Sequence, residues 1–197
     1  ENKHTHLVPE ELEQLERLSL TGKHMKLQKS LDAFLFCCYA GMRYSDFTNL
    51  SKKNIVDINQ ETWLIYKSVK TGTEVRLPLY LLFAGKGIVI LNKYRNNLED
   101  FFRLRDNSNI NKDLIIIAKL AGLSKKISFH TARHTNATLL IYNGVNITTV
   151  QKLLGHKSVK TTQVYTNIMD MTIVHDLEKI KQAALGIKKK TDNSFNK

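Results

Sequence analysis

The chain has few of the residues that define small disulfide-rich or low-complexity proteins. Its 197 residues include 2 prolines, 9 glycines and 2 cysteines, a composition that is ordinary for a folded, helix-rich protein. Cys37 and Cys38 are adjacent in an apolar helical run, so they cannot form a disulfide framework. We expect both to be buried, reduced thiols, which favours a reducing compartment.

The sequence also lacks a signal peptide, an apolar run of membrane-spanning length and a balance of acidic residues. We therefore expect a cytoplasmic protein with no membrane contact. Asp and Glu number 18 against 30 Lys and Arg, which gives a formal charge of +12. This excess favours a polyanionic partner such as nucleic acid. Because the chain starts at Glu1 without an initiator Met, we expect a piece of a longer protein.

The length suits one domain with a real core. Apolar residues at helical spacing predict helices over most of the chain, and short runs of β-branched and aromatic residues after residue 54 predict three short antiparallel strands. The expected fold is therefore mainly α with a small three-stranded sheet (α+β). We place the domain at residues 1–185, with a polar, basic and disordered tail at 186–197. The predicted helices are 23–40, 81–94, 114–123, 130–143, 148–154, 158–166 and 172–185. The predicted strands are 55–56, 63–66 and 75–79. The polar stretch 95–111 is expected to include a loop.

Side chains of matched chemistry lie at uneven spacings along the chain. They supply two fixed cations, an ammonium, two imidazoles and a phenol, a set that suits a phosphodiester substrate. A tyrosine can attack phosphorus, while lysine or histidine moves protons. The set has no acidic metal ligands, so we predict a phosphoryl-transfer site built from protein cations, without metal or cofactor. Its members are Arg43, Lys70, His130, Arg133, His156 and Tyr165.

The string His130-Thr131-Ala132-Arg133 is a weak signal alone, but its helical context strengthens it. Arg133 shares a stripe with apolar residues, where a guanidinium is costly without an anionic partner. A buried structural salt bridge is the alternative interpretation. A zinc site at His130 and His134 is disfavoured, because no further ligand has the usual spacing. Three threonines of the helix are expected to face away from the stripe: Thr131, Thr135 and Thr138.

Two other cationic side chains, Arg43 and Lys70, each have an ordinary structural interpretation as well as a functional one. Arg43 follows a predicted helix stop at Gly41, and Asp46 lies one turn further on, so the two either form a local ion pair or Asp46 aims Arg43 at a phosphate. Lys70 lies at a hairpin turn, where a solvated lysine is usual and contact with a DNA backbone is the functional alternative. Residues 85–87 (Gly-Lys-Gly) lack the spacing of a P-loop, so nucleotide binding is not predicted.

Residues 147–168 can also be interpreted as a helix-turn-helix, with a turn at 155–158. In that interpretation Tyr165 contacts a phosphate and the protein is a DNA-binding regulator without chemistry. Base edges would be contacted by Thr161, Thr162 and Gln163.

Taken in order, these motifs resemble those of the tyrosine recombinase (phage-type integrase) family, and in particular integrases of bacterial mobile elements. The resemblance runs from about residue 7 to residue 167, and both the order and the spacing of the motifs agree. The matching strings are AGMRYSD at 40–46, VKTG at 69–72, HTARH at 130–134, LLGH at 153–156 and TTQVY at 161–165.

The resemblance implies a catalytic domain that cuts DNA through a covalent 3′-phosphotyrosine and rejoins it to another strand. It implies that Tyr165 is the nucleophile and that Arg43 and Arg133 hold the scissile phosphate. Lys70 would protonate the departing 5′ oxygen. His130 would act in proton transfer and His156 would bind a phosphate oxygen, with Asp46 and His134 in support.

The resemblance also implies double-stranded recombination sites as partners and a tetramer on DNA in the full-length protein. Accessory DNA-bending proteins are possible further partners in such a family. We expect the usual N-terminal DNA-clasping domain to be absent from this chain. The predicted helix at 172–185 resembles the element that often packs on a neighbouring subunit, although it could fold back on its own domain. A type IB topoisomerase-like enzyme is the nearest enzymatic alternative.

Overall fold

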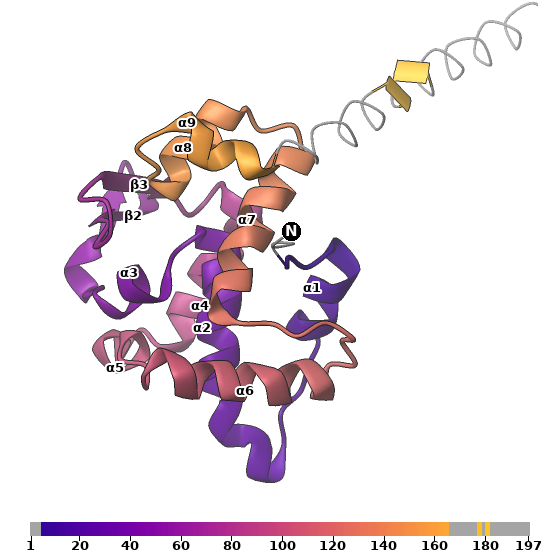
Figure 1. The fold of residues 1–197 in the computed structure, drawn as a ribbon. Coiled ribbons are helices and arrows are strands. Elements are labelled where there is room, and N and C mark those ends of the chain that lie inside the picture. The colour runs from indigo at the N-terminus through magenta and orange to yellow at the C-terminus, as the bar shows by residue number, and fades with distance from the viewer. Residues whose placement is uncertain (1–4, 166–176, 179, 182–197) are drawn as a thin grey trace, which may run out of the picture.

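A computed structural model describes residues 5–165, 177–178 and 180–181. Helices dominate these residues, and one small sheet lies between two helical groups (Figure 1). The predicted α+β class is confirmed. The elements before the sheet are α1 (Pro9–Glu16), η1 (Gly22–Leu27), α2 (Gln28–Ala40), α3 (Tyr44–Thr48) and η2 (Lys52–Asn54), where η marks a 3₁₀ turn. After it come η3 (Leu82–Gly85), α4 (Lys86–Lys93), α5 (Leu98–Phe102), α6 (Asn107–Leu120), α7 (Phe129–Tyr142), α8 (Ile147–Leu154), α9 (Val159–Thr162) and η4 (Gln163–Tyr165).

The sheet is an antiparallel meander in the order β1 (Ile55–Ile58), β2 (Glu61–Lys67) and β3 (Glu74–Pro78). All three predicted strands are therefore present. Leu64 on the central strand pairs with Ile55 on one side and Leu77 on the other. Leu64 and Leu77 are fully buried, so one face of the sheet packs on the core while charged residues of β3 face solvent.

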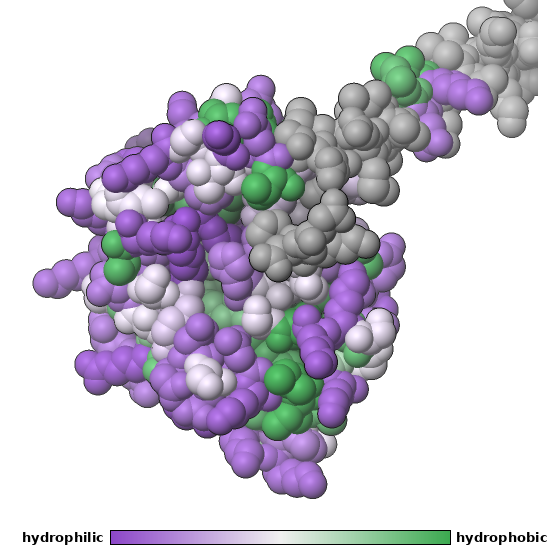
Figure 2. Space-filling model, viewed as in Figure 1, coloured by the Kyte–Doolittle hydropathy of each residue, from purple (hydrophilic) through white to green (hydrophobic). Residues whose placement is uncertain are grey.

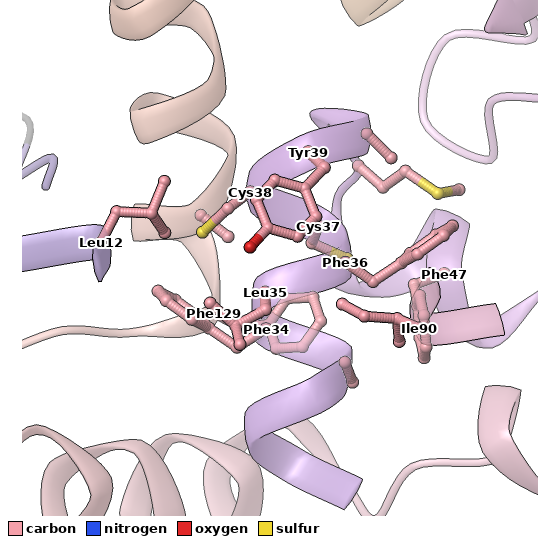
Figure 3. Close-up of a cluster of buried hydrophobic side chains, with 14 of the residues drawn as sticks. Leu12, Phe34, Leu35, Phe36, Cys37, Cys38, Tyr39, Phe47, Ile90 and Phe129 are labelled. Atoms are coloured by element: carbon pink, nitrogen blue, oxygen red, sulfur yellow. The ribbon is translucent and has the colours of Figure 1, made fainter. Parts of the chain in front are cut away.

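Helices α2 and α7 run through the middle of the molecule, with the sheet on one side and α8 and α9 above (Figure 1). From Ser30 to Ala40, every residue of α2 is buried, which is the pattern of a helix enclosed on all sides. Figure 3 shows the apolar side chains around α2, including Phe36, Phe47 and Phe129. Cys37 is buried among them, as is Cys38, as predicted. Each buried phenylalanine contributes about 1.5–3 kcal/mol.

Helix α7 differs from its predicted environment. Thr131, Thr135 and Thr138 do not face solvent; all are buried. Thr135 satisfies its hydroxyl internally, because it donates to the carbonyl of Thr131 at 2.8 Å and accepts from the backbone N–H of Leu7 at 2.9 Å. The threonines therefore pack as small residues against neighbouring segments, and the apolar stripe does not mark the only buried face.

The segment 95–111 contains more helix than its polar composition indicates. Phe101 and Phe102 of α5 are buried, which gives this short helix a packing reason to form. Asp106 caps α6 by accepting from the backbone N–H of Asn109 at 3.1 Å, so α6 starts seven residues before the predicted position.

Several predicted helices are also divided. The predicted helix 23–40 begins as η1, 81–94 begins as η3, and 158–166 divides into α9 and η4. Of the predicted helix 172–185, only residues 177, 178, 180 and 181 are described, and the predicted tail at 186–197 lies outside the described residues.

Candidate active site

Arg133 lies at the centre of the molecule on α7, with 2% of its surface exposed. Its Nη1 donates to the carbonyl oxygen of Gly41 and its Nη2 donates to that of Leu154, each at 2.7 Å. These carbonyls end α2 and α8, where helix dipoles favour a cation. Burial and the charge of Arg43 lower the pKa of Arg133 to about 10, so the guanidinium remains charged at neutral pH.

No carboxylate lies within ion-pair distance of Arg133 among the residues that the structure describes. The described residues therefore give no support to the alternative of a buried structural salt bridge. A buried guanidinium that is held by carbonyl oxygens and has no carboxylate partner among the described residues keeps its full positive charge and favours an incoming anion.

Arg43 lies just before α3, at the edge of the same region. Its Nη1 is 3.6 Å from Asp46 Oδ2 and donates to Ser68 Oγ at 3.4 Å. The Asp46 side chain is fully buried, and its other oxygen accepts from the backbone N–H of Val69 at 2.8 Å. The predicted Arg43–Asp46 pair therefore exists, and it also joins Arg43 to the β2–β3 turn.

Lys70 is exposed in that turn, as both of its interpretations expected. The turn is fixed at its base, because Ser68 N–H donates to the Thr73 carbonyl at 2.8 Å. Thr71 Oγ1 donates to the carbonyl of Gly155 at 3.1 Å, which ties the turn to the end of α8. Lys70 therefore belongs to a loop anchored on both sides, with an ammonium free to reach outward.

His156 follows Gly155 directly and is 9% exposed. Its Nδ1 lies 2.9 Å from Thr162 Oγ1, and its backbone N–H donates to the Gln151 carbonyl at 3.0 Å. Burial, and then the charges of Arg133, Arg43 and Lys70, lower the pKa of His156 to about 4. The imidazole is therefore neutral at physiological pH, and one ring nitrogen can donate a hydrogen bond.

Two histidines and Tyr165 form a second cluster. His134 Nδ1 lies 2.7 Å from the hydroxyl oxygen of Tyr165, and the His130 ring stands perpendicular to that of His134 with centroids 4.4 Å apart. Tyr165 is 5% exposed, while His130 is exposed at the start of α7. Burial raises the pKa of Tyr165 to about 12, although Arg133 and then Arg43 oppose the rise. The phenol therefore lies in the field of both guanidinium groups.

Thr162 contradicts the helix-turn-helix interpretation. It is fully buried and contacts His156, so it cannot reach a base edge, and α9 is only four residues long. Tyr165 also faces the interior. The zinc interpretation gains no support either, because the described residues contain no group of three His, Cys, Asp or Glu side chains able to hold a metal ion.

Three further side chains belong to this region, although the sequence did not predict these roles for them. Ser68 links Arg43 to Asp46, and Thr162 orients His156. Tyr66, on β2, is 5% exposed, and its hydroxyl has no hydrogen-bond partner among the described residues. Burial and the charge of Asp46 raise its pKa, while Arg133 and Arg43 oppose the rise. Ser68 and Tyr66 lie in no motif, so only the fold reveals them, whereas Thr162 lies in the TTQVY string and only its contact with His156 is new.

A cavity of about 490 Å³ lies elsewhere, at the opposite end of α2, between η1 and α6. It shares no residue with the predicted site. On the face drawn in Figure 2, hydrophilic side chains gather over the region between α3 and α8, where the predicted site residues meet. In the described part of the chain, no helix is both long and apolar enough for a bilayer.

The phage integrase family model matches residues 6–171. The chain belongs to this family. A tyrosine recombinase from Pseudothermotoga lettingae is 30% identical over 181 residues, covering 89% of this chain and 60% of the relative. The tyrosine recombinase XerC of Rickettsia prowazekii is 29% identical, covering 92% and 60%. This phage integrase family chain thus spans about 60% of the length of these curated relatives.

Solved structures show the same fold. The XerA recombinase superposes with a TM-score of 0.69 at 25% identity, covering 89% of this integrase-family chain and 64% of XerA. A XerH site-specific recombinase bound to palindromic difH substrate gives a TM-score of 0.65 at 22% identity, with coverages of 91% and 52%. A lambda integrase (75–356) dimer bound to a COC′ core site gives 0.61 at 21% identity, with coverages of 82% and 58%. The predicted tyrosine recombinase catalytic fold is confirmed.

Proposed function

We propose that this chain is the strand-cleaving domain of a site-specific DNA recombinase that works through a covalent 3′-phosphotyrosine. The main support for this proposal is the buried guanidinium of Arg133. It has no carboxylate partner among the described residues and lies near Arg43 and the phenol of Tyr165. A buried cation in this state favours an anion, and the nearby phenol supplies a nucleophile.

In the proposed reaction, Tyr165 Oη attacks the scissile phosphorus and the bond from phosphorus to the 5′ oxygen breaks. Arg43 and Arg133 contact the nonbridging oxygens, where charge increases in the transition state. His156 donates a hydrogen bond to one of these oxygens, since Thr162 can serve the other ring nitrogen. The phosphotyrosine bond retains the free energy of the ester, so rejoining to another strand requires no nucleotide.

Protons move at two positions in this scheme. Lys70 gives a proton to the departing 5′ oxygen, and its anchored turn keeps the ammonium near the phosphate while the side chain reaches outward. His130 acts in proton transfer on the side of Tyr165, where its ring packs on His134. Tyr66 adds a hydroxyl that has no partner among the described residues and can hydrogen-bond the phosphate or the arginines once DNA is bound.

The relatives guide the proposal for the whole protein. XerH is bound to a palindromic difH substrate, and lambda integrase is a dimer on a core site. We infer that the full-length protein acts on paired double-stranded sites as a tetramer, with residues 172–185 packing on a neighbouring subunit. A further N-terminal domain would clasp the other face of the duplex, accessory bending proteins could assist, and residues 1–185 would form the catalytic unit in the cytoplasm.

A nicked suicide substrate tests the proposal on the full-length protein. We expect a covalent protein–DNA adduct on a denaturing gel, and we expect Tyr165→Phe to abolish it while duplex binding remains. Binding without any adduct would instead indicate a regulator. Strand exchange between two labelled duplexes then separates a recombinase from a topoisomerase-like enzyme, which relaxes supercoils without exchanging partners.

A further inference from the structure

The hydroxyl of Tyr165 has a specific protein partner, which is not the histidine of the H-x-x-R motif. His134 Nδ1 lies 2.7 Å from Tyr165 Oη, and both side chains are buried. The rings are 5.7 Å apart between centroids, with an interplanar angle of 57°. This geometry places a ring nitrogen within direct proton-transfer distance of the nucleophile.

The attacking phenol needs such a partner, because it is almost entirely protonated. With the pKa of Tyr165 raised to about 12, the phenolate fraction at pH 7 is roughly 10⁻⁵. A neutral phenol is a weak nucleophile, so the O–H bond must break as the bond to phosphorus forms.

The surroundings of His134 favour this role. In the described part of the chain, its titratable neighbours include His130 on its own helix and Tyr165 on η4. The fixed charges whose fields reach the hydroxyl are Arg133 and Arg43, which favour the phenolate form. The ring of His130, which is exposed, contacts that of His134 edge-on with centroids 4.4 Å apart.

We propose that His134 is a catalytic residue that accepts the Tyr165 proton during strand cleavage and returns it during rejoining. The inference rests on the function proposed above. The proton leaves Oη for the lone pair of Nδ1, and His134 becomes an imidazolium. The Oη–P bond forms, the bond from phosphorus to the 5′ oxygen breaks, and that oxygen takes a proton from Lys70. In the reverse step the imidazolium protonates Tyr165 as it departs.

The test uses His134→Asn in the full-length protein. The Asn Oδ1 and the His Nδ1 are both bonded to Cγ, so Asn retains a hydrogen-bond acceptor near the same position but cannot take up a proton at neutral pH. We expect single-turnover adduct formation on the nicked substrate to slow by about 10²–10⁴-fold. The wild-type rate should rise with pH and reach a plateau, whereas the Asn rate should keep rising as hydroxide replaces the lost base.

Thr138→Val is the matched control. Thr138 lies one turn further along α7, is buried and has a hydroxyl without a hydrogen-bond partner in the described residues. It should leave the rate and the pH profile unchanged. Urea denaturation and duplex binding of His134→Asn and His134→Gln verify folding, and the variant that folds is used for the kinetics.

Two results would overturn the role of His134. An Asn or Gln variant with the wild-type rate and pH profile would show that the contact only positions Tyr165. Faster adduct formation in His134→Phe would show that the contact restrains the nucleophile. Failure of the proposed function looks different, because wild type itself would then form no adduct that depends on Tyr165.

Discussion

Arg133 donates a hydrogen bond to the carbonyl oxygen of Gly41 at 2.7 Å, so the residue that ends α2 also orients a guanidinium of α7. Gly41 has a φ of +66°, and a Cβ there would lie 2.6 Å from Asn136 Oδ1. Asn136 in turn donates to the carbonyls of Cys38 and Tyr39. The close approach of the two central helices, which only glycine permits at this position, therefore sets where the charge of Arg133 lies.

Arg133→Lys should retain the positive charge but greatly slow formation of the covalent adduct. A single ammonium cannot reproduce the planar fork that reaches two carbonyls while presenting N–H groups to a phosphate. By analogy with the loss of an oxyanion donor, we expect a loss of about 2.7–4 kcal/mol, or 10²–10³-fold in adduct formation. Arg43→Ala should show a loss of similar size in the same single-turnover assay. Near-normal cleavage in both variants would refute their assignment as phosphate ligands.

Tyr66→Phe should separate stability from activity. Removing a buried hydroxyl that has no partner in the described residues should leave the free energy of unfolding unchanged or raise it by about 1 kcal/mol. Adduct formation should nevertheless slow, because the proposed site loses a donor. Tyr80→Phe, on a half-buried tyrosine packed against Trp63, is the control for both measurements. A Tyr66→Phe enzyme that is less stable but equally active contradicts this prediction.

Gly155→Ala should destabilise the joint between the sheet and α8. Gly155 has a φ of +63°, and a Cβ there would lie 2.6 Å from Cγ2 of Val75. We expect a loss of about 1–3 kcal/mol in urea denaturation from the overlap, in addition to backbone strain. The double variant with Val75→Ala should show a favourable coupling energy, since it makes room for the methyl group. Purely additive losses would indicate that the clash is not the cause.

Acid should destabilise the fold partly through His156. Burial and three cations lower its folded-state pKa from 6.5 to about 4. As the pH falls below 6.5 the unfolded chain takes up the proton first, so stability declines until the folded state also protonates near pH 4. His156→Gln should therefore lose less stability than wild type between pH 7 and pH 4.5. Ring-proton NMR should show the low pKa directly, and a bound phosphodiester should raise it.

Duplex binding should depend steeply on salt. The chain carries a formal charge of +12, and phosphate contacts release condensed counterions. If six to ten phosphates are contacted, affinity should fall by ~10³–10⁵ between 50 and 200 mM salt, measured by fluorescence anisotropy. A flat profile would remove the electrostatic argument for DNA.

The fold class and the three strands followed from periodicity and turn residues, because each strand is short and bounded by local signals. Helix boundaries were less predictable. Nothing local in the polar segment 95–111 indicates that Phe101 and Phe102 are buried, since their partners come from distant elements such as Phe47. The threonine face of α7 was misjudged for the same reason, because Leu7 reaches Thr135 from 128 residues away.

For the site, the sequence supplied the residues with distinctive chemistry and the fold supplied their relations. Arg133 was expected on the core side of its helix, and it is buried there. Its hydrogen-bond partners are the carbonyls of Gly41 and Leu154, because the C-terminal ends of α2 and α8 meet at Arg133. No pattern in the sequence predicts that these two helix ends lie together. Tyr66 stayed hidden because a tyrosine in a strand ordinarily only packs.

The carboxylate of Asp46 makes two contacts, one with the guanidinium of Arg43 and one with the backbone N–H of Val69 beside Lys70. Displacing the lysine loop would therefore disturb the arginine as well. If a phosphate of the duplex binds Arg43 as proposed, its position would also affect the distance from the Lys70 ammonium to the departing oxygen. Under the proposed function, binding of the phosphate and protonation of the cut end would then be coupled through a single carboxylate.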